Sequence, residues 1–313
     1  MLCAIASGAV LALQQRINGA LRLRLHDILV ASLVSLCLSL AVTATALLLR
    51  PAARQAVAAL RQVPLWRLTG GLGGACMVVV GAAAVPRLGV ALLTVGLVAG
   101  QTGGALVVDR IGLGPSGRHP LTASRLLGAL LCLVAVGIGL LGSGARQADP
   151  WLLVVVVVTG ALSAAQQALN GRVAEETGSA SVATMLNFGT GFAAVVVVVL
   201  VSSVRSGWPQ PDWSSARDWY LYLGGPMGVS VVGVAAVVVR SLGVLRLGLA
   251  VVGGQLLGSL LLDVVAPAHG TQVDLPTVIG ALLTMFAVAV ASTGFNRRRR
   301  VRRASERQPA EPS

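Results

Sequence analysis

The sequence predicts an all-α integral membrane protein with ten transmembrane helices, arranged as two inverted five-helix repeats. Its composition, the spacing of its apolar runs and an internal duplication support this prediction. Of the 313 residues, 55% are hydrophobic and only 11% are charged. Because about a quarter of the residues in soluble domains are charged, this composition excludes an ordinary soluble protein.

Ten apolar runs, bounded by charges or Pro, approach or exceed the roughly 20 residues that a helix needs to cross a bilayer. Val-rich stretches such as 154–158 would favour strands in water, but backbone groups in lipid must bond within their own segment, which a helix achieves. The turns near 85/88 and 239/242 are very short. The first span, with no basic residue before it, is predicted to be retained and not cleaved as a signal peptide. The predicted spans are 2–21, 28–49, 68–85, 88–108, 126–142, 151–171, 180–202, 219–239, 242–264 and 277–295.

The basic residues predict the orientation of these spans. All 24 are Arg, and the net charge is +13. With both termini in the cytoplasm, 17 of the 24 fall on the inner side, as the rule that positive loops stay inside requires. The chain is therefore predicted to lie in the inner (plasma) membrane with both termini cytoplasmic. The Arg-rich tail, 296–313, is predicted to be disordered and to contact anionic lipids; a nucleic-acid partner is rejected because the Arg residues lie between apolar runs.

An internal duplication is the strongest signal in the sequence. Gly8 to Gly19 recurs as Gly160 to Gly171, at an offset of 152 that also relates Ser35 to Asn187. At an offset of 154, a second set of positions matches: Gly70, Gly74, Gly100, Gln101, Gly104 and Asp109 with Gly224, Gly228, Gly254, Gln255, Gly258 and Asp263. We therefore divide the chain into repeats 1–145 and 146–295, followed by the tail.

The number of spans in each repeat predicts a mechanism. Five is odd, so the second repeat enters the membrane upside down relative to the first. Two equivalent halves can exchange conformations, which gives outward-open and inward-open states of similar energy. The sequence therefore predicts a small-molecule transporter that works by alternating access.

The G-x-x-x-A-x-Q-x-x-x-N-G start, the A-S-x-x-S segment, the P-R-L-G turn and the G-Q…D helix resemble the YdcZ-like family of the drug/metabolite transporter superfamily. The resemblance covers roughly 4–142 and 158–292, and this chain is similar to a fused, two-unit form. It implies a ten-helix inner-membrane carrier, often an exporter. The chain departs from the pattern at Arg240-Ser241, where the first half has Pro86-Arg87, and at Asn187 in place of Ser35.

Uncharged polar residues inside the spans are the candidate substrate site. Gln14 and Asn18 are four residues apart and share a helix face, as do Gln166 and Asn170. Such amides bond neighbouring helices or line a polar cavity, and the sequence leaves both readings open. The Asn-Gly pairs are also typical of helix ends. The candidates are Gln14, Asn18, Ser35, Gln101, Gln166, Asn170, Asn187 and Gln255.

Two further sets have other predicted roles. Asp109 and Asp263 end the fourth span of each half and are candidates for proton coupling, although a solvated or Arg-paired carboxylate is the alternative. Arg16 and Arg246 lie near span ends, where they snorkel to the interface or bind an anionic substrate. Glycines four apart predict close helix packing: Gly70, Gly74, Gly100, Gly104, Gly224, Gly228, Gly254 and Gly258.

Other functions lack the residues they need. The four Cys and three His are scattered, so neither a metal site nor a cofactor is predicted. No Asp or Glu lies deep in a predicted span and no aromatic cage is visible, which disfavours export of cations. A membrane-embedded lipid enzyme and a non-transporting scaffold are the rival functions: the first lacks a catalytic cluster, and the second has no need of an inverted duplication. The sequence predicts a small molecule as substrate and leaves its identity, the coupling ion and the choice between monomer and homodimer open.

Overall fold

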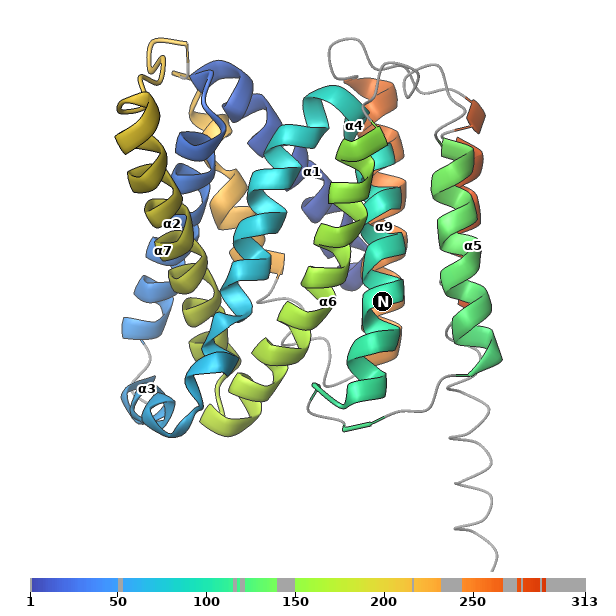
Figure 1. Cartoon of the computed structure of the whole chain (residues 1–313), viewed down its shortest axis with the longest axis horizontal. Coiled ribbons are helices and arrows are strands. Elements are labelled where there is room, and N and C mark those ends of the chain that lie inside the picture. The colour runs from blue at the N-terminus through green and yellow to red at the C-terminus, as the bar shows by residue number, and fades with distance from the viewer. Residues whose placement is uncertain are drawn as a thin grey trace, which may run out of the picture.

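The chain folds into a bundle of helices that stand side by side (Figure 1). The computed structural model describes residues 2–49, 53–114, 117–118, 122–139, 150–215, 217–231, 244–266, 275–276, 278–287 and 289–290. Within these ranges the chain forms helices and connecting loops, with no strand. The predicted tail, 296–313, lies outside the described residues.

The first half contains the predicted helices in their predicted order. Its elements are α1 (Leu2–Leu25), α2 (Ile28–Leu48), α3 (Ala53–Ala59), the short 3-10 helices η1 (Leu60–Gln62) and η2 (Leu65–Thr69), α4 (Gly70–Ile111) and α5 (Ala123–Gly139). The tight turn between α1 and α2 contains Asp27, whose side chain accepts hydrogen bonds from the backbone N–H groups of Leu29 and Val30. This cap satisfies two of the N–H groups that a helix start leaves without partners.

The long helix α4 is two legs joined at a sharp break. Gly89 has φ 74° and ψ 168°, a backbone conformation that favours glycine, and Pro86 lies just before it. The chain rises along the first leg, bends, and descends along the second (Figure 1). The two legs correspond to the predicted spans 68–85 and 88–108, and Gly89 fixes where the turn falls.

The second half begins with two long helices and is described in part beyond them. Its elements are α6 (Pro150–Thr177), α7 (Ala180–Ser206), η3 (Trp219–Tyr222), a helical segment at 224–231, α9 (Val244–Val265) and helical residues at 275–276, 278–287 and 289–290. Residues 232–243, with the predicted turn at 239/242, lie outside the described residues, as does the side chain of Arg246.

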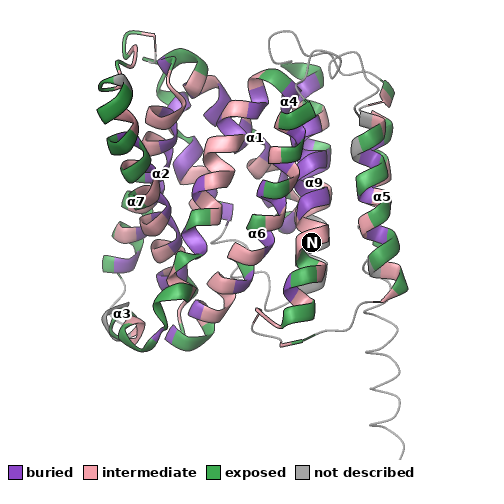
Figure 2. Cartoon of the chain, viewed as in Figure 1, coloured by how far each residue is buried: buried purple, intermediate pink, exposed green. Residues whose placement is uncertain are grey.

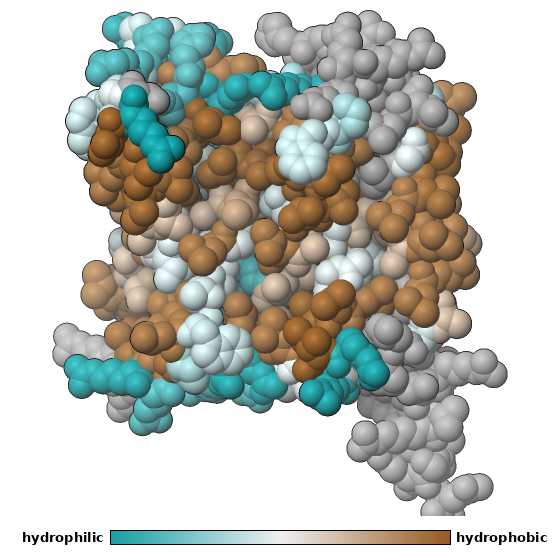
Figure 3. All heavy atoms as spheres, viewed as in Figure 1, coloured by the Kyte–Doolittle hydropathy of each residue, from teal (hydrophilic) through white to brown (hydrophobic). Residues whose placement is uncertain are grey.

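The surface of the bundle is apolar at mid-height. Hydrophobic residues form a belt between hydrophilic ends (Figure 3), and exposed positions line the outer faces of α5 and α7 (Figure 2). Four described helical segments are long and apolar enough to cross a membrane: Ile28–Leu48, Leu65–Ile111, Pro150–Thr177 and Ala180–Arg205. An apolar belt of this kind is stable only in lipid, so the chain is a multi-pass membrane protein.

The second leg of α4 lies at the centre of the bundle. Residues 88–100 of this leg are all buried, and seven of them pack in the main apolar cluster with residues of α1, α5, α6 and α9. The elements that surround this leg therefore come from both halves of the chain.

Candidate functional site

The candidate amides of the first half face the second half. Asn18 of α1 accepts a hydrogen bond from the Ser35 hydroxyl of α2, with 3.2 Å between Oδ1 and Oγ. A Cβ added at Gly224 would lie 2.1 Å from Asn18 Oδ1, and one added at Gly228 would lie 2.7 Å from Gln14 Nε2. Gln14 and Asn18 therefore pack directly against glycines of the segment 224–231.

The amides of the second half make the matching arrangement. Gln166 and Asn170 of α6 both donate to Asn187 Oδ1 of α7, at 2.7 and 3.0 Å. A Cβ at Gly70 would lie 2.8 Å from Asn170 Oδ1, and one at Gly74 would lie 2.9 Å from Gln166 Nε2. Asn187 occupies the position that Ser35 has in the first half, and its longer side chain accepts from both amides.

These contacts repeat when the two halves are exchanged. Asn18 against Gly224 becomes Asn170 against Gly70, at the same offsets of 152 and 154 that the sequence repeat shows. The first and second helices of each half thus hold the third helix of the other half. Contacts that are exchanged in pairs are typical of two units related by a two-fold axis.

The fourth helices follow the same rule. A Cβ at Gly254 of α9 would lie 1.9 Å from the Ile5 carbonyl oxygen of α1, and one at Gly100 of α4 would lie 1.8 Å from the Val157 oxygen of α6. Gly258 and Gly104 lie against Ala9 and Ala161 in the same way. Because these glycines lack a side chain, the backbones of helices from different halves come into direct contact.

Asp263 holds the break in α4 from the opposite half. Its carboxylate oxygens accept hydrogen bonds from the backbone N–H groups of Val90 and Ala91, at 3.1 and 2.7 Å. These are the first N–H groups of the second leg, which the break at Gly89 leaves without helical partners. The side chain of Asp263 is buried and not solvated, so the structure replaces the solvated carboxylate of the sequence reading with a helix cap.

Arg16 completes this corner of the interface. It donates to the carbonyl oxygen of Ala266 at the end of α9 and interacts electrostatically with Asp263. The role of Arg16 as an anchor of the helix end follows from these contacts. Asp109, the repeat partner of Asp263, is half-buried and is also engaged in an interaction.

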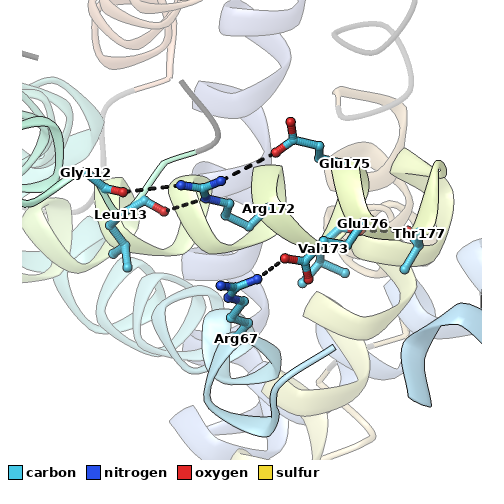
Figure 4. A network of polar contacts seen from close by, with 8 residues as sticks. All are labelled: Arg67, Gly112, Leu113, Arg172, Val173, Glu175, Glu176 and Thr177. Carbon is cyan, nitrogen blue, oxygen red and sulfur yellow. Dashed lines mark hydrogen bonds and ion pairs between the residues drawn. The ribbon is translucent and has the colours of Figure 1, made fainter. Parts of the chain in front are cut away.

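Arg172 makes the equivalent contact at the other end of the bundle, and the sequence analysis missed it. This residue of α6 donates to the carbonyl oxygens of Gly112 and Leu113, each at 3.4 Å (Figure 4). Gly112 is the repeat partner of Ala266, the acceptor of Arg16. The sequence repeat aligns Arg16 with Ala168, one helical turn before Arg172, so the two arginines share a role without sharing an aligned position.

Four buried polar atoms lack a hydrogen-bond partner among the described residues: Gln15 Oε1, Arg67 Nε, Thr94 Oγ1 and Gln255 Nε2. The repeat partner of Gln255, Gln101, is half-buried and lies 3.4 Å from the Ser163 hydroxyl. Buried polar atoms without partners are costly, so they often mark a place for water or a polar ligand. Of these residues only Gln255 was a sequence candidate; Gln15 sits beside Gln14, and its position in the same apolar run was the available signal.

The described residues contain no group of three or more His, Cys, Asp or Glu side chains close enough to bind a metal.

A family model described as "Putative inner membrane exporter, YdcZ" matches the chain twice, over residues 1–138 and 151–290. The two matches fall on the two halves that exchange contacts. A search of curated proteins gave no match.

Proposed function

The chain belongs to the YdcZ family of inner membrane exporters, and we propose that it moves a small molecule by alternating access between two inverted five-helix halves. The observation that carries this proposal is the exchange of contacts between the halves. The contact of Asn18 with Gly224 has its equivalent in that of Asn170 with Gly70. The contact of Gly254 with Ile5 likewise has its equivalent in that of Gly100 with Val157. The interface is built twice from equivalent residues. It can therefore shift from one arrangement to the arrangement in which the two halves have exchanged conformations, at little cost in free energy.

The proposal includes the direction of the spans. Repeats 1–145 and 146–295 each have five spans, and the second runs opposite to the first. Both termini lie in the cytoplasm, on the side where the arginine-rich segments gather. The end of the bundle that contains Arg67 and Arg172 is then cytoplasmic, and the end that contains the α4 break is extracytoplasmic.

The substrate site lies between the halves and is lined by Gln14, Asn18, Gln101 and their repeat partners. In the present arrangement Ser35 bonds Asn18, and Asn187 bonds Gln166 and Asn170. When one side opens, the amides exchange their partners for the substrate. Uncharged amides and hydroxyls favour a substrate with uncharged polar groups, and the unpartnered Nε2 of Gln255 supports a polar ligand at this interface.

Asp263 and Asp109 are the proposed coupling residues. Asp263 is buried, bonds two N–H groups of the opposite half and has Arg16 beside it. Protonation of this carboxylate would weaken both its hydrogen bonds to the N–H groups and its attraction to Arg16, because a neutral acid is a weaker acceptor and carries no charge. Proton binding is thereby linked to the contact that holds the α4 break.

The proposal is tested by cysteine accessibility after the native Cys are removed. Cys placed at Gln14, Asn18, Gln166 and Asn170 is expected to react with a hydrophilic thiol reagent, and the side from which it reacts is expected to change with the state of the protein. Val158→Cys, at an exposed position in the apolar belt, is the unreactive control. Uniform protection of all four positions would contradict the proposed site and favour a packing role alone.

Substrate identity requires a separate experiment. Metabolites inside and outside cells with and without this gene are compared, and the substrate is expected to accumulate inside when the gene is absent. A profile that does not differ between the two strains under several growth conditions would contradict export.

A further inference from the structure

A polar network joins the two halves at one end of the bundle (Figure 4). Arg67, in η2 just before α4, forms an ion pair with Glu176 of α6. The Arg67 guanidinium also lies over the Trp66 ring, 5.1 Å from its centroid. One turn earlier on α6, Arg172 bonds the residues that follow α4. Because the two legs of α4 start and finish at the same end of the bundle, α6 is attached there to both the start and the finish of α4.

Beneath the ion pair lies an apolar cluster, here called the Val173 cluster. Its members are Val63, Val173 and Ala183, with Leu60, Leu68, Ala174 and Leu186 packed against them. A second cluster, the Leu21 cluster, contains Leu21, Leu25, Ala31 and Leu221, with Ala20, Val30, Val34 and Tyr222 packed against them.

The two clusters are repeat partners. At the offsets of the duplication, Val173 corresponds to Leu21 and Leu68 corresponds to Tyr222. Ala183 and Leu186 correspond to Ala31 and Val34 in the same way. In the span directions proposed above, these clusters close opposite ends of the interface between the halves. Each end is therefore sealed by an equivalent set of apolar side chains.

The ion pair breaks this equivalence. The repeat partner of Arg67 is Leu221, which is only 1% exposed and belongs to the Leu21 cluster. The repeat partner of Glu176 is Arg24. A leucine and an arginine cannot form an ion pair, so these two positions join the halves by charge at one end of the bundle and not at the other.

We propose that Arg67 and Glu176 form a gate that holds the halves together at their end of the bundle and sets the resting state of the transporter. The proposal rests on alternating access. Two equivalent halves give two states of similar energy, so a contact present at one end alone decides which state is more populated. The paired side chains are 26% and 30% exposed, so solvent screens the pair and its loss shifts the population by about two- to fivefold.

The test uses two reporter cysteines in a background without native Cys. Leu68→Cys reports on the Val173 cluster and Tyr222→Cys on the Leu21 cluster, and both react with a hydrophilic thiol reagent that is present on both sides of the membrane. Arg67→Gln or Glu176→Gln is expected to raise the labelling rate at Leu68→Cys about two- to fivefold and to lower it at Tyr222→Cys. Arg61→Gln, an exposed arginine in the preceding helix η1, is the matched control.

A charge swap separates the gate from general damage to the fold. Arg67→Glu combined with Glu176→Arg retains both charges and is expected to restore the parental labelling at both reporters. Unchanged labelling in the single variants would overturn the gate, and so would an equal rise at both reporters, which indicates loosening without a change of state.

The same reporters distinguish failure of the gate from failure of alternating access. Leu25→Ser weakens the Leu21 cluster and is expected to raise labelling at Tyr222→Cys while lowering it at Leu68→Cys. If Leu25→Ser gives this reciprocal change and Arg67→Gln gives none, the gate is overturned and alternating access stands. If no variant changes the two reporters in opposite directions, both proposals fail.

Discussion

The closest contacts between the halves predict that neighbouring glycines differ sharply in how well they tolerate replacement by alanine. In α9, a Cβ at Gly254 would lie 1.9 Å from the Ile5 oxygen, whereas one at Gly253 would meet nothing within 4 Å. In α4, Gly100 and Gly103 form the same contrast, since a Cβ at Gly100 would lie 1.8 Å from the Val157 oxygen and one at Gly103 would meet nothing within 4 Å. Each buried glycine thus has an open glycine on the same helix as its control.

The expected magnitudes follow from these distances. Backbone atoms cannot move aside as a flexible side chain can, so Gly254→Ala forces α1 and α9 apart, and such overpacking costs about 1–3 kcal/mol. At Gly253 the added methyl meets open space, and Gly→Ala there stabilises the helix by up to about 1 kcal/mol. The two variants should therefore differ by about 1–4 kcal/mol in their free energies of unfolding.

The assay is unfolding of the purified protein in a titration with SDS, followed by tryptophan fluorescence. Gly254→Ala and Gly100→Ala are expected to lose stability by similar amounts, because the repeat gives them equivalent neighbours. Gly253→Ala and Gly103→Ala are expected to match or exceed the parent. If Gly254→Ala proved as stable as Gly253→Ala, the direct contact between α1 and α9 would be refuted, and with it the exchange of contacts between the halves.

Further predictions concern single polar groups. Asp263→Ala should cost about 1 kcal/mol in the same titration, as loss of a helix cap does, and Asp263→Asn should cost less because it retains an acceptor. Asp109→Ala should cost a similar amount, since the repeat places Asp109 opposite the start of α9; a negligible loss would show that Asp109 does not cap α9. Asn187→Ala should cost about 1 kcal/mol, more than Asn170→Ala, because Asn187 accepts two interhelical bonds. In the loop after α7, hydroxyl donors lower the pKa of Asp212 from 3.8 to about 2, so its stabilising effect should be complete above pH 3.8 and be lost as the pH falls through about 2; fluorescence of Trp213 that stays constant over this range would contradict it.

The sequence was sufficient to predict helices, family and repeat, because each depends on local pattern. Apolar run lengths predicted the legs of α4, and the short turn near 85/88 matches the observed break at Gly89. The duplication also predicted which positions would correspond: the contacts of Gly100 and Gly254 obey its offsets. Periodicity and repetition are properties of the chain itself, so they can be read without a structure.

The partners of the polar residues could not be predicted in this way. Asp263 bonds Val90 and Ala91, which are 173 and 172 residues away, and no spacing rule links such positions. The shared role of Arg16 and Arg172 was hidden because the second arginine lies one turn further along its helix. Gln15 was overlooked because the Gln14–Asn18 spacing selects a helix face about 100° away from it, and its unpartnered oxygen is visible only in the packed interface.

The differences between the halves say more about which of the two states is more populated than their similarities do. A pair of identical halves would populate the outward-open and inward-open states equally. The protein would then have no intrinsic preference for either state. The positions that break the symmetry are therefore where such a preference must originate. Ser35 is replaced by Asn187, which binds two amides where Ser35 binds one, and Arg67 is replaced by Leu221. Asn187 adds a second hydrogen bond between α6 and α7, and Arg67 joins η2, just before α4, to α6. Both extra polar contacts therefore involve α6 and strengthen its packing at the same end of the first leg of α4.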